Sequence, residues 1–149
     1  MPTTTDRAAW AEAARICACF NLRRAARAVT RLFDEILEPG GVSAAQFATL
    51  VVIYVEGAPT LPRLARTLGV DRSTLTRTMK TLARAGLVRS QVASRTASAR
   101  LTPKGERTLL RCLPLWKEAQ GRFESSVGSE NWRSILDGLS AVVAAVPDA

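Results

Sequence analysis

The sequence predicts a mainly α-helical fold of the α+β type, with six helices and one two-stranded β-hairpin. Apolar residues recur at steps of three and four positions over most of the chain, which is the period of a helix. Capping residues, glycines and prolines divide these stretches into separate helices. Only the segment from Leu87 to Leu101 has strand character. With 149 residues, 47% of them apolar, the chain is expected to form one domain with its own core.

The first predicted helix runs from about Arg7 to Leu37 as one segment. This stretch contains no glycine or proline, and Pro39-Gly40-Gly41 ends it. A helix of about 30 residues is long for a small domain. Its apolar stripe must be covered by another surface, and a second copy of the chain is the simplest candidate for that surface.

The second and third helices lie on either side of the break at Pro59. The second is expected to begin with a capping box formed by Ser43 and Gln46. The third is short and turns Leu61, Leu64 and Leu68 inward.

The turn Gly69-Val70-Asp71 separates the third helix from the fourth, which runs from about Arg72 to Ala85. Asp71 is a good N-cap for this helix, and Gly86 is the residue expected to follow its end. Two short helices joined by a glycine turn are typical of a helix-turn-helix.

Two strands, Leu87 to Val92 and Thr96 to Leu101, are expected to form a hairpin with Arg95 at its tip. Thr102-Pro103 then opens the fifth helix. Pro114 lies inside that helix and is expected to kink it. The sixth helix starts near Ser129.

The net charge of +8 is concentrated in one part of the chain. The segment from Ala58 to Arg111 holds 12 basic and two acidic residues, whereas the remaining residues are slightly acidic. Such asymmetry favours a polyanionic partner, and it falls on the helix-turn-helix and the hairpin. The alternative is a solvated basic face without a partner.

Several classes of enzyme are excluded by composition. The chain has no histidine, which removes histidine-bound zinc, Ser-His-Asp triads and imidazole proton transfer. It also lacks a glycine-rich phosphate loop and paired carboxylates in a plausible cleft. We therefore assign no catalytic residue, metal ligand or cofactor, and expect that the protein is not an enzyme.

The sequence also predicts a cytoplasmic location without a membrane partner. No apolar stretch approaches the length of a transmembrane helix. Charged residues occupy the N-terminal stretch where a signal peptide would need its apolar core. Three cysteines without an export signal favour a reducing compartment.

The fourth helix carries the residues expected to bind DNA. Leu75, Met79 and Leu82 point inward, so the polar residues between them fall largely on the outer face. Such a helix fits the major groove, where arginine pairs with guanine and Ser or Thr reaches bases or phosphates. An arginine at the hairpin tip can enter an A·T-rich minor groove. The expected DNA-binding residues are Arg72, Ser73, Thr74, Thr76, Arg77, Lys80 and Arg95.

Three stretches resemble the MarR family of bacterial winged helix-turn-helix transcription regulators. They are Leu61-Pro-Arg-Leu-Ala-Arg-Thr-Leu-Gly-Val-Asp-Arg-Ser-Thr-Leu-Thr-Arg, Leu82-Ala-Arg-Ala-Gly-Leu-Val and Leu101-Thr-Pro-Lys-Gly. The resemblance implies a homodimer built from residues 1–42 and 103–149, with a DNA-binding region at residues 43–102. It also implies a pseudo-palindromic operator and a ligand pocket between the two regions, with ligand binding usually relieving repression.

One departure from the family pattern affects the wing. The usual Asp-x-Arg or Asp-Arg-Arg motif would begin at Ala93 and Ser94, and only Arg95 remains. Because the aspartate normally orients the wing arginine, Arg95 is expected to be less fixed.

Two further groups of residues are candidates for sensing a signal. Arg23 and Arg27, with Trp116, would suit an anionic or aromatic effector; the alternative is a solvated basic face and packing tryptophans. Some relatives of this type sense peroxides through a first-helix cysteine, which makes Cys17, Cys19 and Cys112 redox candidates. Cys17 and Cys19 would point about 200° apart in a regular helix, and the alternative is that all three are small apolar fillers.

Besides an effector-controlled repressor, the sequence leaves three alternatives open. These are a thiol-based redox regulator, a non-specific architectural DNA-binding protein, and a protein-interaction module that does not bind DNA.

Overall fold

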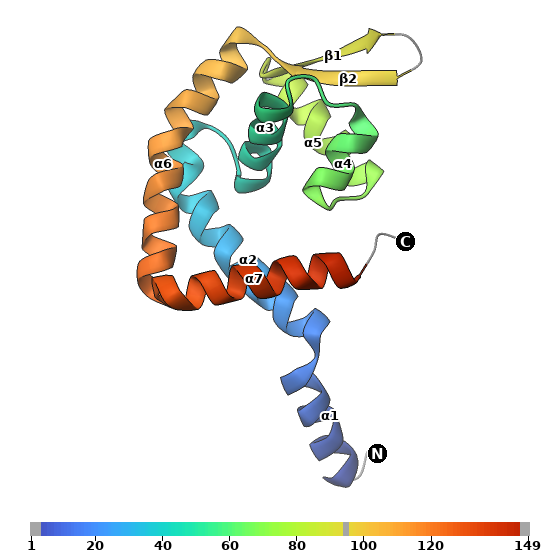
Figure 1. Ribbon diagram of the computed structural model, residues 1–149, viewed down its shortest axis with the longest axis vertical. Helices are drawn as coiled ribbons and strands as arrows, with labels where there is room; N and C mark the ends of the chain where they lie inside the picture. The colour runs from blue at the N-terminus through green and yellow to red at the C-terminus, as the bar shows by residue number, and fades with distance from the viewer. Residues whose placement is uncertain (1–3, 94–95, 147–149) are drawn as a thin grey trace.

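The computed structural model describes residues 4–93 and 96–146, and this part of the chain is mainly α-helical with one β-hairpin (Figure 1). The predicted fold class is therefore confirmed. The elements are α1 (Thr4–Ile16), α2 (Ala18–Leu37), the 3₁₀ turn η1 (Glu38–Gly40), α3 (Ala44–Glu56), α4 (Leu61–Leu68), α5 (Arg72–Arg84), β1 (Val88–Ala93), β2 (Thr96–Leu101), α6 (Pro103–Val127) and α7 (Ser129–Ala145).

The prediction of one unbroken first helix was wrong, because the chain leaves the helical path at Cys17. The backbone there is extended, with ψ of 113°, and α2 restarts at Ala18. The side-chain amide of Asn21 donates to the carbonyl oxygens of Arg15 and Cys17, at 3.0 and 2.9 Å. These bonds satisfy carbonyl groups at the break. The described residues therefore form seven α-helices rather than six.

The helix boundaries elsewhere follow the capping residues read from the sequence. Ser43 and Gln46 form both bonds of the capping box at the start of α3. Thr102 caps α6, with Pro103 in its first turn. Pro114 lies inside α6, which continues through it as one helix and follows a curved path (Figure 1).

One core joins the long helices to the smaller unit formed by α3, α4, α5 and the hairpin. α2 packs along α6, whereas α1 projects away from the rest of the molecule (Figure 1). β1 and β2 are antiparallel, with Val88 opposite Leu101. A backbone bond from Ala99 to the Pro59 carbonyl ties β2 to the start of α4. The largest fully buried side chains are Leu37, Leu50, Ile53, Leu64, Leu82 and Cys112.

The start of α6 is locked onto the turn that follows α5. The Thr102 hydroxyl donates to the Gly86 carbonyl at 2.6 Å, and Lys104 Nζ donates to the Ala85 carbonyl at 2.7 Å. Gly105 packs so closely that a Cβ atom there would overlap the backbone carbonyl of Leu87. The position of α6 relative to α5 and the hairpin is therefore set by backbone contact.

No single described helix has both the length and the apolar composition to cross a membrane. Only the bent pair of segments Ala18–Gly40 and Ala44–Glu56 meets both criteria, when the two are taken together.

The packing of Gly105 leads to a stability prediction. We expect Gly105→Ala to lower the free energy of unfolding by about 2–3 kcal/mol, because backbone must move to admit the methyl group. Urea denaturation at a fixed protein concentration measures the change.

Gly121→Ala is the matched control, since Gly121 lies in the same helix and a Cβ atom there meets nothing within 4 Å. We expect this change to raise stability by about 0.5–1 kcal/mol through helix propensity. Equal effects of the two substitutions would contradict the described packing.

Candidate nucleic-acid interface

Helix α5 has one buried face and one exposed, basic face. Leu75, Met79 and Leu82 are buried in the core, as the helical period predicts. Their burial turns the intervening polar side chains toward solvent. The exposed residues on α5 include Arg72, Ser73, Thr76, Arg77 and Lys80. All of these except Lys80 line one shallow surface hollow.

Asp71 organises the first turn of α5. Its carboxylate accepts a hydrogen bond from the hydroxyl of Ser73 at 2.6 Å. It accepts two more from the hydroxyl and the backbone N–H of Thr74, at 2.7 Å each. The bonds from Ser73 and Thr74 hold the pKa of this exposed carboxyl well below its usual range. Asp71 is therefore ionised at physiological pH and fixes the hydroxyl groups of both neighbours.

Thr74 and Thr76 occupy different positions on the helix. Thr74 is half-buried, and its hydroxyl is already bonded to Asp71, which makes it part of the cap. Thr76 is exposed, and its hydroxyl donates to the Arg72 carbonyl at 2.8 Å. In this arrangement the outward-facing hydrogen-bond donors among the α5 side chains are those of the arginines and the lysine.

The cationic groups of α5 are not neutralised by neighbouring acids. The ion pairs within residues 4–93 and 96–146 join Glu12 to Arg15, Glu56 to Arg63, and Glu118 to Arg122. None of them involves Arg72, Arg77 or Lys80. The exposed face of α5 therefore presents Arg72, Arg77 and Lys80 as cations that are available to an anion.

The hairpin adds a pair of arginines that sequence reasoning did not single out. Arg89 on β1 is directly opposite Arg100 on β2, and both are exposed. Opposed like charges destabilise a hairpin unless an anion lies near them. The two arginines are about equally far from the middle of the predicted turn, and that spacing is the signal that could have found them. Arg95, the expected tip residue, lies outside the described residues.

The effector candidates lie on the long helices and away from α5 in the sequence. Arg23 and Arg27 are exposed on α2. Trp116 is half-buried on α6 and packs against the core. The described contacts do not join these three residues into one site.

The cysteines have contrasting surroundings. Cys17 and Cys19 are exposed at the break between α1 and α2. Cys112 is buried, its Sγ lies 3.8 Å from the Gly40 carbonyl oxygen, and burial raises the pKa of its thiol. A protonated, enclosed thiol is a poor nucleophile, so Cys112 behaves as a packing residue. In the described part of the chain, no group of three or more Cys, Asp or Glu side chains is placed to hold a metal ion.

Comparison with known proteins identifies the family to which this arrangement belongs. The MarR family model matches residues 42–92, which include α3, α4 and α5. A comparison with curated protein sequences found no match.

Solved structures match nearly the whole chain. The M. tuberculosis transcriptional regulator MosR is 37% identical, with a TM-score of 0.78 over 89% of this chain and 99% of that chain. Its complex with DNA gives 37% identity and a TM-score of 0.75, over 88% of this chain and 99% of that chain.

A more distant structure shares the fold. The transcriptional repressor CouR, bound to p-coumaroyl-CoA, is 24% identical, with a TM-score of 0.78 over 87% of this chain and 94% of that chain.

The helix-turn-helix, the hairpin and the long flanking helices thus occur together in DNA-binding regulators. The chain belongs to the MarR family, and it is a DNA-binding transcription regulator rather than an enzyme.

Proposed function

We propose that the protein is a dimeric, sequence-specific transcription repressor whose DNA binding is relieved by a small anionic or aromatic effector. The proposed reading of DNA rests on the exposed face of α5, where Arg72, Arg77 and Lys80 have no acidic partner among the described residues. A helix of this kind fits the major groove, where arginine reads guanine and lysine contacts phosphate.

A pseudo-palindromic operator follows from two copies of this surface. Residues 43–102 would bind DNA, and residues 1–42 and 103–149 would hold the dimer together. With one α5 from each subunit, the half-sites would be about one helical turn of DNA apart. The exposed Arg89 and Arg100 of the hairpin would add phosphate contacts, and Arg95 is proposed to enter the minor groove.

Exposed apolar side chains on the terminal helices support the dimer. Trp10 on α1 is 73% exposed and Val143 on α7 is 76% exposed. Large apolar side chains exposed in this number favour an interface. A second copy of the chain is the proposed partner, and its binding would cover Trp10, Ile16, Phe20, Leu22, Ile135, Leu136, Leu139, Val142 and Val143.

The effector and the location are inferred from relatives and charge. CouR, which shares the fold, binds p-coumaroyl-CoA, an anionic ligand with an aromatic group. Arg23 and Arg27 on α2, with Trp116 on α6, are the residues proposed to meet such a molecule here. A regulator that binds DNA in this way would act in the cytoplasm.

A redox response is the second candidate function, and the helix break at Cys17 favours it. A regular helix would point the Cys17 and Cys19 side chains to opposite sides, but the extended backbone at Cys17 removes that restriction. A peroxide ROOH would oxidise the two thiols to a disulfide, releasing ROH and water. Cys112 has no part in this proposal.

The main test is a selection of bound fragments from genomic DNA, followed by electrophoretic shifts with the selected site and with random DNA at the same salt concentration. We expect the selected site to bind at least about 10³-fold more tightly. Equal affinity for both would indicate an architectural protein, and no binding to either would indicate an interaction module.

Arg77→Ala tests base readout. Loss of a bidentate arginine–guanine contact is expected to weaken binding to the selected site by about 1–3 kcal/mol and to relax its sequence preference. Fluorescence anisotropy with the site and single-base variants measures both effects. Arg122→Ala on α6 is the control, because Arg122 pairs with Glu118 and lies outside the proposed interface.

Leu139→Glu tests the proposed dimer. A carboxylate within the apolar stripe of α7 is expected to dissociate the dimer, which sedimentation velocity detects as a fall in mass. Ala141→Glu places the same charge on the opposite side of α7 and is expected to leave the mass unchanged. Monomeric wild-type protein would contradict the proposal before either variant is made.

Cys17→Ser with Cys19→Ser tests the redox candidate. Peroxide is expected to release wild-type protein from DNA, with thiol reductant restoring binding, and to leave the double variant bound. Peptide mass spectrometry without reductant identifies the disulfide. Cys112→Ala is expected to respond as the wild type does. Release of the double variant by peroxide would rule out the Cys17–Cys19 switch.

A further inference from the structure

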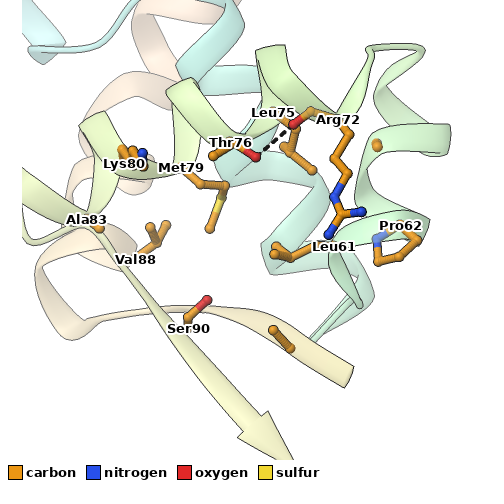
Figure 2. A pocket seen from close by; sticks show the side chains of 12 residues that line it. Leu61, Pro62, Arg72, Leu75, Thr76, Met79, Lys80, Ala83, Val88 and Ser90 are labelled. Atoms are coloured by element: carbon orange, nitrogen blue, oxygen red, sulfur yellow. Dashed lines mark hydrogen bonds between the residues drawn. The ribbon is translucent and has the colours of Figure 1, made fainter. Parts of the chain in front are cut away.

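Thr76 lies among the basic residues on the exposed face of α5. It lines the shallow hollow there together with Arg72, Ser73 and Arg77. It also lines a pocket between α4, α5 and the hairpin, which Figure 2 shows from close by. Its side chain is exposed, and it directly precedes Arg77, the residue proposed to read guanine. Recognition helices contact base edges with their N-terminal residues, and Thr76 is the fifth residue of α5.

The hydroxyl group of Thr76 already has a partner within the helix. It donates to the Arg72 carbonyl oxygen at 2.8 Å, and Figure 2 marks this bond with a dashed line. A threonine hydroxyl in a helix commonly bonds in this way to the carbonyl one turn earlier. Because its only polar hydrogen is held in this bond, the Thr76 side chain has no donor left for a base or a phosphate.

The methyl group of Thr76 is the part of the side chain that remains for DNA. Hydroxyl and methyl occupy two different staggered positions on the same Cβ atom. Since the hydroxyl is turned to the backbone carbonyl, the methyl group is directed away from it, at the exposed surface. The hollow therefore presents an apolar group among its cations.

Ser73, the other hydroxyl residue of the hollow, differs from Thr76. Its hydroxyl donates to the Asp71 carboxylate at 2.6 Å, and serine has no methyl group. Arg72 and Arg77 present guanidinium donors. Of the four described residues that line the hollow, Thr76 is thus the one with a methyl group to offer.

Thymine is the DNA base that matches a methyl group. In the major groove only thymine carries a methyl group, at C5, and the methyl of threonine is one of the apolar groups suited to contact it. The oxygen of Thr76 retains a lone pair that could accept from the amino group of adenine or cytosine. The variants below separate that contact from the apolar one.

We propose that Thr76 determines sequence preference by placing its methyl group against the C5-methyl group of a thymine in each half-site. This inference rests on the proposed sequence-specific binding of DNA by α5, and it assigns to Thr76 one base and one mode of contact. Loss of the contact is expected to weaken binding about fourfold. This factor corresponds to about 0.8 kcal/mol, the value for burial of one CH₂-sized apolar group.

Deoxyuridine provides the direct test, because it pairs with adenine as thymine does and lacks only the C5-methyl group. Each thymine of the selected DNA site is replaced in turn by deoxyuridine. Fluorescence anisotropy then measures the Kd of the full chain for each duplex at one salt concentration. We expect the wild-type protein to bind about fourfold more weakly when one particular thymine of a half-site is replaced.

Three variants identify the group responsible. Thr76→Ser keeps the hydroxyl and removes the methyl, so it is expected to bind the thymine and deoxyuridine duplexes equally. Thr76→Val removes the hydroxyl and keeps a methyl, so it is expected to retain the fourfold difference. Thr81→Ser is the matched control. Thr81 is also exposed on α5, and its hydroxyl donates to the Arg77 carbonyl at 3.1 Å, but it lies five residues further along the helix. This variant is expected to respond to deoxyuridine as the wild type does.

Each comparison is made within one variant, so a change in the fraction of folded protein affects both duplexes alike. The proposal is overturned if the wild-type protein is indifferent to every deoxyuridine, or if Thr76→Ser retains the full difference. It is also overturned if Thr76→Val loses affinity for the thymine duplex while Thr76→Ser does not, because the hydroxyl oxygen would then make the contact.

Failure of this inference is distinguishable from failure of the proposed function. If the wild-type protein prefers the selected site to random DNA by about 10³-fold and the deoxyuridine test fails, sequence-specific binding stands and only the role of Thr76 falls. If no site is preferred over random DNA, the proposed function fails and the role of Thr76 falls with it.

Discussion

The contact between Gly105 and the Leu87 carbonyl determines how the two parts of the molecule are joined. A backbone carbonyl occupies the space that any side chain at Gly105 would need. Thr102 and Lys104 add bonds to the same turn, so the first turn of α6 is held at several points. The turn that accepts these bonds, at Ala85 and Gly86, connects α5 to the hairpin. The placement of α5 and the hairpin, the elements proposed to read DNA, therefore depends on a junction with little freedom, and a movement of α6 would be transmitted to both.

Burial of one face of α5 is what creates the basic surface. Leu75, Met79 and Leu82 anchor the helix, and the arginines and lysine between them can only face outward. Asp71 is the carboxylate at the N-terminus of α5, and it accepts hydrogen bonds from Ser73 and Thr74. The carboxylate therefore caps the helix, and it forms none of the ion pairs found among the described residues. Leu75 and Met79 also line the pocket between α4, α5 and the hairpin, together with the exposed Arg72 and Lys80.

The terminal helices contrast with this well-packed unit. α7 has no buried residue in the single chain, and α1 makes contact mainly with α2. Apolar side chains left exposed to water are unfavourable in free energy, and the proposed second copy of the chain would bury them. The break at Cys17 lies within this region. Two exposed thiols, those of Cys17 and Cys19, lie at this break, outside the core that holds α5.

The sequence by itself determined the features that depend on local chemistry. Capping by Ser43, Asp71 and Thr102, the inward residues of α5 and the hairpin follow from side-chain preferences and periodicity, and the structure confirms them. The break at Cys17 escaped prediction because no glycine or proline signals it, and the bonds of Asn21 complete it.

Only the tertiary structure decided the close packing of Gly105, the pairing of Arg89 with Arg100, and the pocket between α4, α5 and the hairpin. Each brings together residues that are distant in the chain. Such proximity results from the packing of whole elements, which no local pattern encodes.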